Sequence, residues 1–207
     1  MVRDAIIEEF LTDLSSKNPT PGGGGASSVA GATGVSLGQM VINLTLGKKK
    51  YAEYEETLRE CYETLETLKE SFFSLADKDE EVFLPLSKAY SMPKETEEEK
   101  RVKEQFMEQA LVDATLVPLS VMDTAVGALE VLTTVAKCGS KLAISDAGVG
   151  ASMLRTALEG AAFNVKINVK AMKNEDRKTA FTERMDRNLN YGIRMAEDIL
   201  EIVDSRL

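Results

Sequence analysis

The chain has 207 residues, a formal net charge of -9 and no histidine. The acidic balance argues against nucleic acid as a partner, because phosphate binding needs a dominant basic face. The missing histidine excludes the catalytic triads that use His and most catalytic zinc sites. If the chain is an enzyme, proton transfer falls to Asp, Glu, Lys, Tyr or Cys side chains.

The length and even composition are typical of one domain over residues 1–207, or of one that completes its core by oligomerising. Cys61 and Cys138 lie far apart and fit no metal-binding spacing, so we expect reduced thiols and no metal. The sequence has no signal-peptide pattern, and Gly, Asp or Lys interrupts its longest apolar runs. We therefore expect a cytoplasmic protein without a membrane-spanning segment.

The first half of the chain predicts four helices from the spacing of its apolar residues. A short amphipathic helix covers residues 3–16. The next, over about 27–46, carries small residues at three- and four-residue steps, which would let a neighbouring helix or a second copy of the chain approach closely. A long helix over 53–76 is expected to be interrupted at 77–79. A shorter one then covers 81–92 and ends before a proline.

The second half predicts three more helices. A very long one reaches about Lys137 and contains Pro118, so we expect a kink or break near that proline. A helix rich in Gly and Ala follows Gly139, and the last covers residues 176–205. No alternating strand pattern emerges. The prediction is an all-α, up-and-down bundle of about six to eight helices, packed through Gly and Ala stripes and homodimeric.

The stretch NPTPGGGGASS contains four consecutive glycines. Glycine loses more backbone freedom on folding than other residues, so such a run indicates either a linker or a required close approach. It is not a Walker loop, because no Lys-Ser/Thr follows at the required spacing. The apolar helix behind it disfavours a linker. A plain helix start remains, or a glycine turn whose free N–H groups suit an anion or a polar ring edge.

Other polar groups also have both a structural and a functional interpretation. Asp77 and Asp79, at the interruption expected after residue 76, are either a helix cap with a surface charge or an acid/base pair. Two asparagines one turn apart would meet another helix or a heterocycle, since buried amides need partners. A lysine run is a solvated helix end or a site for a polyanionic tail. These residues are Asp77 and Asp79, Asn164 and Asn168, and Lys48, Lys49 and Lys50; Asp146 is an N-cap candidate.

Several motifs occur in a fixed order along nearly the whole chain. They are TPGGGGASSVAGATGVSLGQMV, then ADKDEEVF with MPKETEEEKR, then ATLVPLSVM, and finally GSKLAISDAGVGASML with GAAFNVKINV. Together they resemble the cyclodeaminase/cyclohydrolase family of folate enzymes, and SDAGV followed by NVKIN is the most specific pair. The resemblance implies an all-helical homodimer that binds a tetrahydrofolate carrying a one-carbon unit.

The resemblance also implies a reaction. The best-known family member closes 5-formiminotetrahydrofolate to 5,10-methenyltetrahydrofolate with release of ammonia, whereas stand-alone relatives interconvert methenyl- and 10-formyltetrahydrofolate. We predict the cyclodeaminase, with the cyclohydrolase as the alternative, because ammonia and water as leaving groups make similar demands on a site. The rival from another class is a non-catalytic helical dimer whose glycines serve packing alone.

The family motifs assign roles to particular residues. Asp79, with Phe83 after it, matches the acidic position of a D-x-x-x-F pattern and is the expected acid/base; Asp77 is the second choice. The glycine run would give backbone contacts, Asp146 and the two asparagines would meet the pterin, and the lysines would hold the glutamate tail. The expected substrate-binding residues are Gly22, Gly23, Gly24, Gly25, Asp146, Asn164, Asn168, Lys48, Lys49 and Lys141, with Lys50 and Lys137 as further tail candidates.

Overall fold

The computed structural model describes residue 2 and residues 6–207, and these residues are helical almost throughout, with no strand among them. The all-α prediction is confirmed. The elements are α1 (Ile7–Leu14), α2 (Gly23–Asn43), the 3-10 segment η2 (Lys49–Tyr54), α3 (Glu55–Ser91), α4 (Glu97–Cys138), the 3-10 segment η3 (Lys141–Ala143), α5 (Ile144–Ala171) and α6 (Glu175–Arg206).

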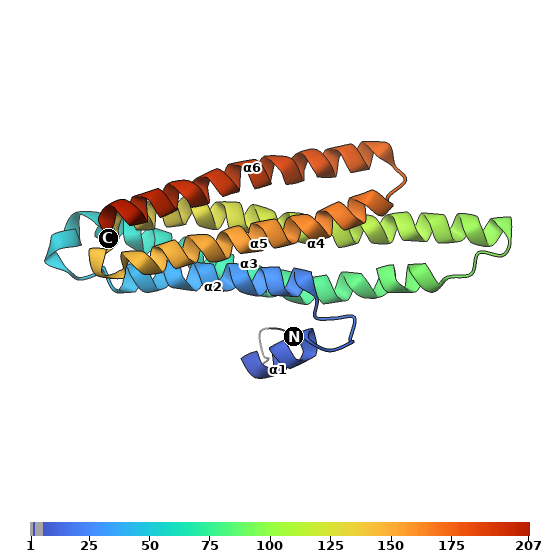
Figure 1. The fold of residues 1–207 in the computed structure, drawn as a ribbon, viewed down its shortest axis with the longest axis horizontal. Helices are drawn as coiled ribbons and strands as arrows, with labels where there is room; N and C mark the ends of the chain where they lie inside the picture. Colours follow the sequence, from blue (N-terminus) through green and yellow to red (C-terminus); the bar gives the residue numbers. More distant parts are fainter. Residues whose placement is uncertain (1, 3–5) are drawn as a thin grey trace.

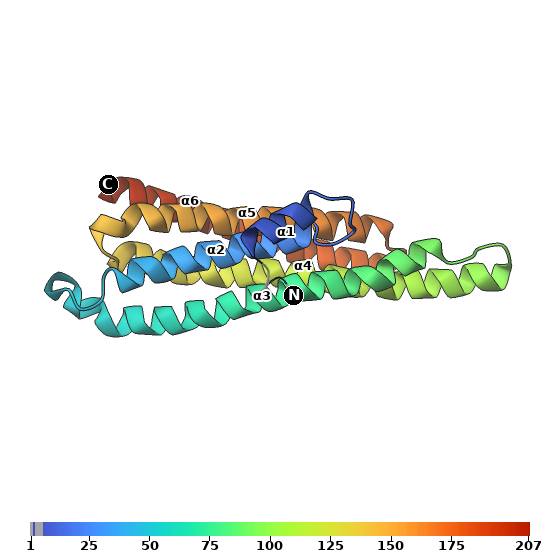
Figure 2. The ribbon, with the colours of Figure 1, turned by 90° about the horizontal axis from the view of Figure 1, so that it is seen from below.

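The helices α2 to α6 run alternately up and down along one long axis (Figure 1). α2 packs against α3, α4 and α5, while α6 packs against α4 and α5. The short helix α1 lies outside this bundle, beside α2 (Figure 2). The hairpin of α3 and α4 extends beyond the end at which α2 begins (Figures 1 and 2). At that end, therefore, α3 and α4 continue past the first residue of α2 (Figures 1 and 2).

The core is built from aliphatic side chains of every helix from α2 to α6. Val35, Leu65, Leu129, Leu154 and Ile199 are examples that are almost completely buried. α4 contains the stretch of the described chain that is long and apolar enough to cross a membrane, but 56% of that stretch is buried among the other helices. Burial of this kind is what a core helix of a bundle needs.

Two glycines let α2 and α5 touch through their backbones. A Cβ atom added to Gly34 would lie 2.8 Å from the carbonyl oxygen of Gly150, and one added to Gly150 would lie 3.0 Å from that of Gly34. No real side chain tolerates such contacts without a shift of the helices. The Gly and Ala stripes predicted from the sequence therefore do pack helix against helix.

Two predicted helix boundaries are wrong, and of the kink or break expected at Pro118 the break does not occur. α2 begins at Gly23 rather than near residue 27, so most of the glycine run forms its first turn. α3 continues through residues 77–79 and through Pro85, because buried residues before and after the acidic stretch stay on one face of a single helix. α4 likewise passes Pro118 without a break. Long-range packing outweighs the local signals for an interruption at these places.

Candidate functional site

A cavity of about 350 Å³ opens where α2 begins, over the groove between α3 and α5. Its wall combines glycine backbone, one carboxylate, two amides and several apolar side chains. The lining residues are Pro19, Thr20, Gly22, Gly23, Gly24, Asp79, Val82, Phe83, Leu86, Tyr90, Ala114, Asn164, Ile167 and Asn168. Residues that the sequence marked at three separate places therefore meet in one cavity: the glycine run, Asp79 with Phe83, and the two asparagines.

Asp79 lies directly against the glycine turn of α2. A Cβ atom added to Gly24 would overlap both carboxylate oxygens of Asp79. The backbone N–H of Gly25 donates a hydrogen bond to the same carboxylate, as an N–H of a first helical turn can, because it has no partner within its helix. Glycine is needed at position 24 because only a residue without a side chain leaves room for this carboxylate.

The environment of Asp79 favours the protonated carboxyl group. Burial raises the pKa of Asp79 above its ordinary value, and the neighbouring charge of Glu80 raises this pKa further. The hydrogen bond from Gly25 opposes both effects, since it stabilises the ionised form. A carboxyl group whose pKa moves toward neutrality is suited to both accepting and donating a proton.

The two asparagines are held by hydrogen bonds to backbone carbonyls. The side-chain amide of Asn164 donates to the carbonyl oxygen of Gly160 at 3.1 Å, and that of Asn168 donates to the carbonyl of Ala114 at 2.9 Å. Ala114 has a free carbonyl because Pro118, one turn later, has no N–H to donate. Each asparagine side chain thus uses one of its two N–H groups within the protein, and its carbonyl oxygen remains an acceptor for a ligand.

The cavity can therefore bind a flat, polar heterocycle. The first turn of α2 supplies backbone N–H donors near Gly23 and Gly24, while Asp79 and the asparagine oxygens supply acceptors. Phe83 and Tyr90 add aromatic surface from α3. A ring with both donors and acceptors on its edge would find acceptors for its N–H groups and N–H donors for its oxygen and nitrogen atoms. Asp79 could exchange a proton with such a ring.

The remaining predicted site residues lie elsewhere. Asp77 accepts a hydrogen bond from the backbone N–H of Val2 at 2.6 Å and does not line the cavity. Asp146 lies in the first turn of α5 without acting as its N-cap, about 27 Å along that helix from Asn164 at 1.5 Å per residue.

The lysines predicted for the glutamate tail lie at the same far end of the bundle. The ammonium of Lys48 donates to the hydroxyl of Ser140 at 3.3 Å, and the backbone N–H of Lys141 donates to the hydroxyl of Tyr51 at 3.1 Å. Lys49 begins η2 nearby. Within one protomer, these lysines cannot reach a small ligand that also touches Gly24 and Asp79.

Sequence reasoning missed the cavity residues Leu86 and Tyr90. They follow Asp79 and Phe83 at helical spacing, so all four lie along one face of α3. The signal was present in the sequence, but the interruption predicted at residues 77–79 concealed it. Among residues 2 and 6–207, no cluster of three or more Cys, Asp or Glu side chains could hold a metal ion.

Known proteins resemble this chain over its whole length. The family model described as Formiminotransferase-cyclodeaminase matches residues 6–187. A methenyltetrahydrofolate cyclohydrolase of Methylorubrum extorquens is 38% identical, with 100% of both chains covered. A formimidoyltransferase-cyclodeaminase of Rattus norvegicus is 29% identical over 98% of this chain, which spans 38% of that longer protein.

A solved structure resembles the fold closely. The crystal structure of a formiminotetrahydrofolate cyclodeaminase from Thermotoga maritima gives a TM-score of 0.83 at 29% identity, covering 100% of this chain and 98% of that one. These similarities confirm the resemblance noted in the sequence motifs. The chain belongs to the formiminotransferase-cyclodeaminase family of folate one-carbon enzymes.

Proposed function

We propose that this enzyme closes 5-formiminotetrahydrofolate to 5,10-methenyltetrahydrofolate with release of ammonia, in the cavity where α2 begins. The observation that carries the proposal is the half-buried carboxyl group of Asp79, which lies against Gly24 in a cavity that also holds Asn164 and Asn168. The relative of known structure from Thermotoga maritima bears the name of this activity.

The pterin ring binds between the glycine turn and the asparagines. Its amino group and ring N–H groups donate to the carbonyl oxygens of Asn164 and Asn168, and its carbonyl oxygen accepts from the first N–H groups of α2. Phe83 and Tyr90 cover the apolar part of the substrate. This orientation places the N5 and N10 atoms of the folate close to Asp79.

Ring closure then needs one bond to form, one to break and one proton to move. N10 attacks the carbon of the protonated formimino group (–CH=NH2+), N10 loses its proton to Asp79, and the same carboxyl group passes that proton to the departing nitrogen, which then carries the three hydrogens of ammonia. The bond between the carbon and that nitrogen breaks, ammonia leaves, and the methenyl bridge remains. Holding N10 against the carbon supplies much of the rate, because it replaces an encounter between separate groups. A raised pKa of Asp79 suits both proton transfers.

The second candidate is the methenyltetrahydrofolate cyclohydrolase reaction. The observation that favours it is the 38% identity to a cyclohydrolase over the full length of both chains. Water would add to the methenyl carbon and lose one proton to Asp79. The remaining hydroxyl proton would pass to N5 as the bond from that carbon to N5 breaks, and Asp79 would release its proton to solvent. The product is 10-formyltetrahydrofolate. Both reactions use the same carboxyl group and the same position of the folate.

We also propose that the enzyme is a homodimer that pairs through α1, α2 and α5. Each of these helices exposes large apolar side chains, among them Ile7 (77%) on α1, Met40 (45%) on α2, and Phe163 (69%) and Ile167 (68%) on α5. Pairing would bury them, and burial of apolar surface favours association. Sedimentation equilibrium should give the mass of two chains; the mass of one chain at micromolar concentration would contradict the proposal.

Absorbance of the methenyl product tests the reaction. The purified enzyme is mixed with 5-formiminotetrahydrofolate and, separately, with 5,10-methenyltetrahydrofolate. A rise of the methenyl band with ammonia release supports the cyclodeaminase; loss of the band faster than without enzyme, with no formimino activity, supports the cyclohydrolase. Absence of both activities, together with no folate binding in a titration, would leave the non-catalytic helical dimer.

A further inference from the structure

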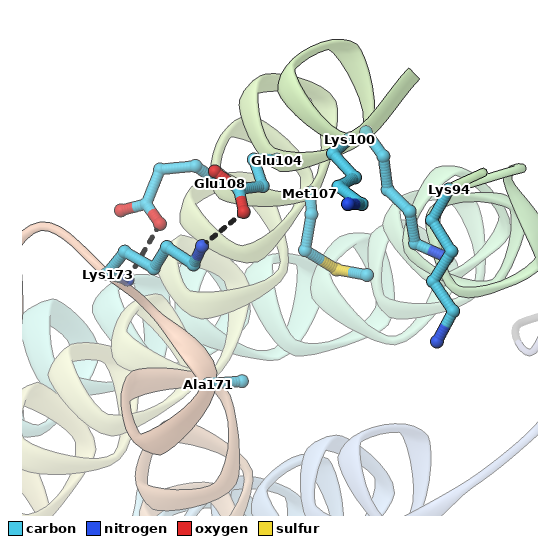
Figure 3. A pocket seen from close by; sticks show the side chains of 8 residues that line it. Lys94, Lys100, Glu104, Met107, Glu108, Ala171 and Lys173 are labelled. Atoms are coloured by element: carbon cyan, nitrogen blue, oxygen red, sulfur yellow. Dashed lines mark hydrogen bonds and ion pairs between the residues drawn. The ribbon is translucent and has the colours of Figure 1, made fainter. Parts of the chain in front are cut away.

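A second cavity, rich in lysine, follows the first along the bundle. It has a volume of about 260 Å³ and lies between the turn after α3, the first part of α4 and the end of α5. Lys94 and Lys100 lie on one side of it and Lys173 on the other, with Met107 between them (Figure 3). Lys103 is the fourth lysine of the lining.

The cavity carries more positive charge than its own acids neutralise. Four lysines and two glutamates line it, on a chain whose net charge is -9. Glu104 pairs with the ammonium of Lys173 at 2.6 Å, and Glu108 accepts the backbone N–H groups of Lys173 and Asn174 at 2.9 and 3.2 Å. Both carboxylates are therefore already engaged on the Lys173 side (Figure 3).

The other lysines keep positive charge available. Lys94 has no partner among the residues described, and Lys100 pairs only with the exposed Glu97, at 2.6 Å. The ammonium of Lys103 donates to the carbonyl oxygens of Tyr90 and Met92, both at 2.8 Å, and meets no carboxylate. An anionic group entering the cavity would find cations that the protein does not neutralise.

The two cavities share α4 and α5, and the turn after α3 joins the second cavity to the helix that lines the first. On α4, Met107 of the second cavity lies two turns, about 10 Å, from Ala114 of the first. On α5, Ala171 follows Asn168 by less than one turn. On the α3 side, the ammonium of Lys103 donates to the backbone carbonyl of Tyr90, and Tyr90 itself lines the first cavity. The second cavity thus continues the first along α4 and α5.

We propose that the lysine cavity binds the glutamate carboxylates of the folate tail. This inference rests on the proposed function, since it needs the pterin in the first cavity with N10 near Asp79. The aminobenzoyl group and its glutamates extend from N10, so a substrate lying along the groove carries its carboxylates toward Lys94 and Lys100. Met107 and Ala171 offer an apolar floor for the methylene groups of the tail. Lys103 positions the turn that carries Lys94.

The test compares substrates with different tails. Wild type, Lys94→Ala, Lys94→Glu and Lys100→Ala are assayed with triglutamate and monoglutamate forms of the substrate, and with a pteroate form that lacks glutamate. Lys94 and Lys100 are exposed, so their replacement should not disturb folding. Lys49→Ala, an exposed lysine at the other end of the bundle, is the matched control.

The expected change is in KM alone, because neither lysine touches the reacting atoms. KM for the triglutamate should rise about threefold to fivefold for each alanine variant and about tenfold for Lys94→Glu, as for loss of exposed ion pairs. KM for the pteroate form and kcat for all forms should stay unchanged, and Lys49→Ala should match wild type. Equal KM values for wild type and the Lys94 and Lys100 variants on the triglutamate would overturn the tail site.

The two proposals fail in different ways. If wild type turns over none of the folates, the proposed function is wrong and the tail site falls with it. If wild type is active and only Lys49→Ala raises KM for the triglutamate, the reaction stands and the tail binds at the other end of the bundle. If wild type does not distinguish the triglutamate from the pteroate form, no tail site exists.

Discussion

The two ends of the bundle use their polar groups differently. At the far end, where α2 finishes and α5 begins, polar groups are bound mainly to one another. At the near end, where α2 begins, several polar groups are left for a ligand. At the far end, Thr45 accepts the N–H of Ser140 at 2.7 Å, and Arg206 donates to the carbonyl of Gly139 at 2.7 Å. At the near end, Asp79 and the carbonyl oxygens of the asparagines border an open cavity. Polar groups thus close the fold at one end and border a site at the other.

The pKa shifts differ in the same way. At the far end, a hydrogen bond from the backbone N–H of Lys141 is the main cause that lowers the pKa of Tyr51. At the near end, burial raises the pKa of Asp79 despite the hydrogen bond from Gly25. A shift that arises from burial beside a cavity indicates a functional site better than one that arises from a structural hydrogen bond.

Asp79→Asn should have the largest effect of any single change. Loss of a positioned acid/base typically lowers turnover about 10²- to 10⁴-fold, and the amide cannot replace it. Circular dichroism should show an unchanged helical spectrum. The matched control is Asp77→Asn, two positions away and outside the cavity. Its turnover should stay within about threefold of wild type, because Asp77 does not contact the substrate. Equal losses of turnover in the two variants would contradict the assignment of Asp79 as the acid/base.

Gly24→Ala should come next. The added Cβ overlaps the carboxylate of Asp79, so the side chain must rotate away from the glycine turn. We expect turnover to fall about 10- to 100-fold, because a small displacement of a catalytic group is costly. Gly23→Ala is the control, since its Cβ would make an ordinary 3.8 Å contact with Asn164. Activity that survives in Gly24→Ala and not in Gly23→Ala would contradict this account of the turn.

A smaller effect is expected on stability. Because the pKa of Asp79 is raised in the fold, the native protein loses stability as pH rises from the ordinary Asp range through that raised pKa. Asn carries no charge and can still accept the N–H of Gly25. Thermal unfolding of Asp79→Asn should therefore occur a few degrees above wild type at pH 7, and the difference should disappear near pH 4. A variant less stable than wild type at pH 7 would show that the ionised carboxylate stabilises the fold.

The periodicity of the apolar residues predicts the fold class, whereas the glycine run and the family motifs predict seven of the fourteen residues that line the cavity. The start of α2 was misplaced because glycine disfavours helices, and the first turn of this helix is almost entirely glycine. Local patterns also carry no information on which helix ends meet. For that reason the sequence groups Lys48 and Lys141 with Gly22, although the structure places these lysines at the opposite end of α2, and it gives no sign that Lys94 lines a cavity.

Hydrogen–deuterium exchange with a stable tetrahydrofolate analogue tests the central claim most directly, because it reports which end of the bundle the ligand covers. The account predicts slower exchange in residues 22–26 and 79–94 on binding, with residues 44–51 and 140–146 unchanged. Protection confined to residues 44–51 and 140–146 would contradict the placement of the folate against Gly24 and Asp79.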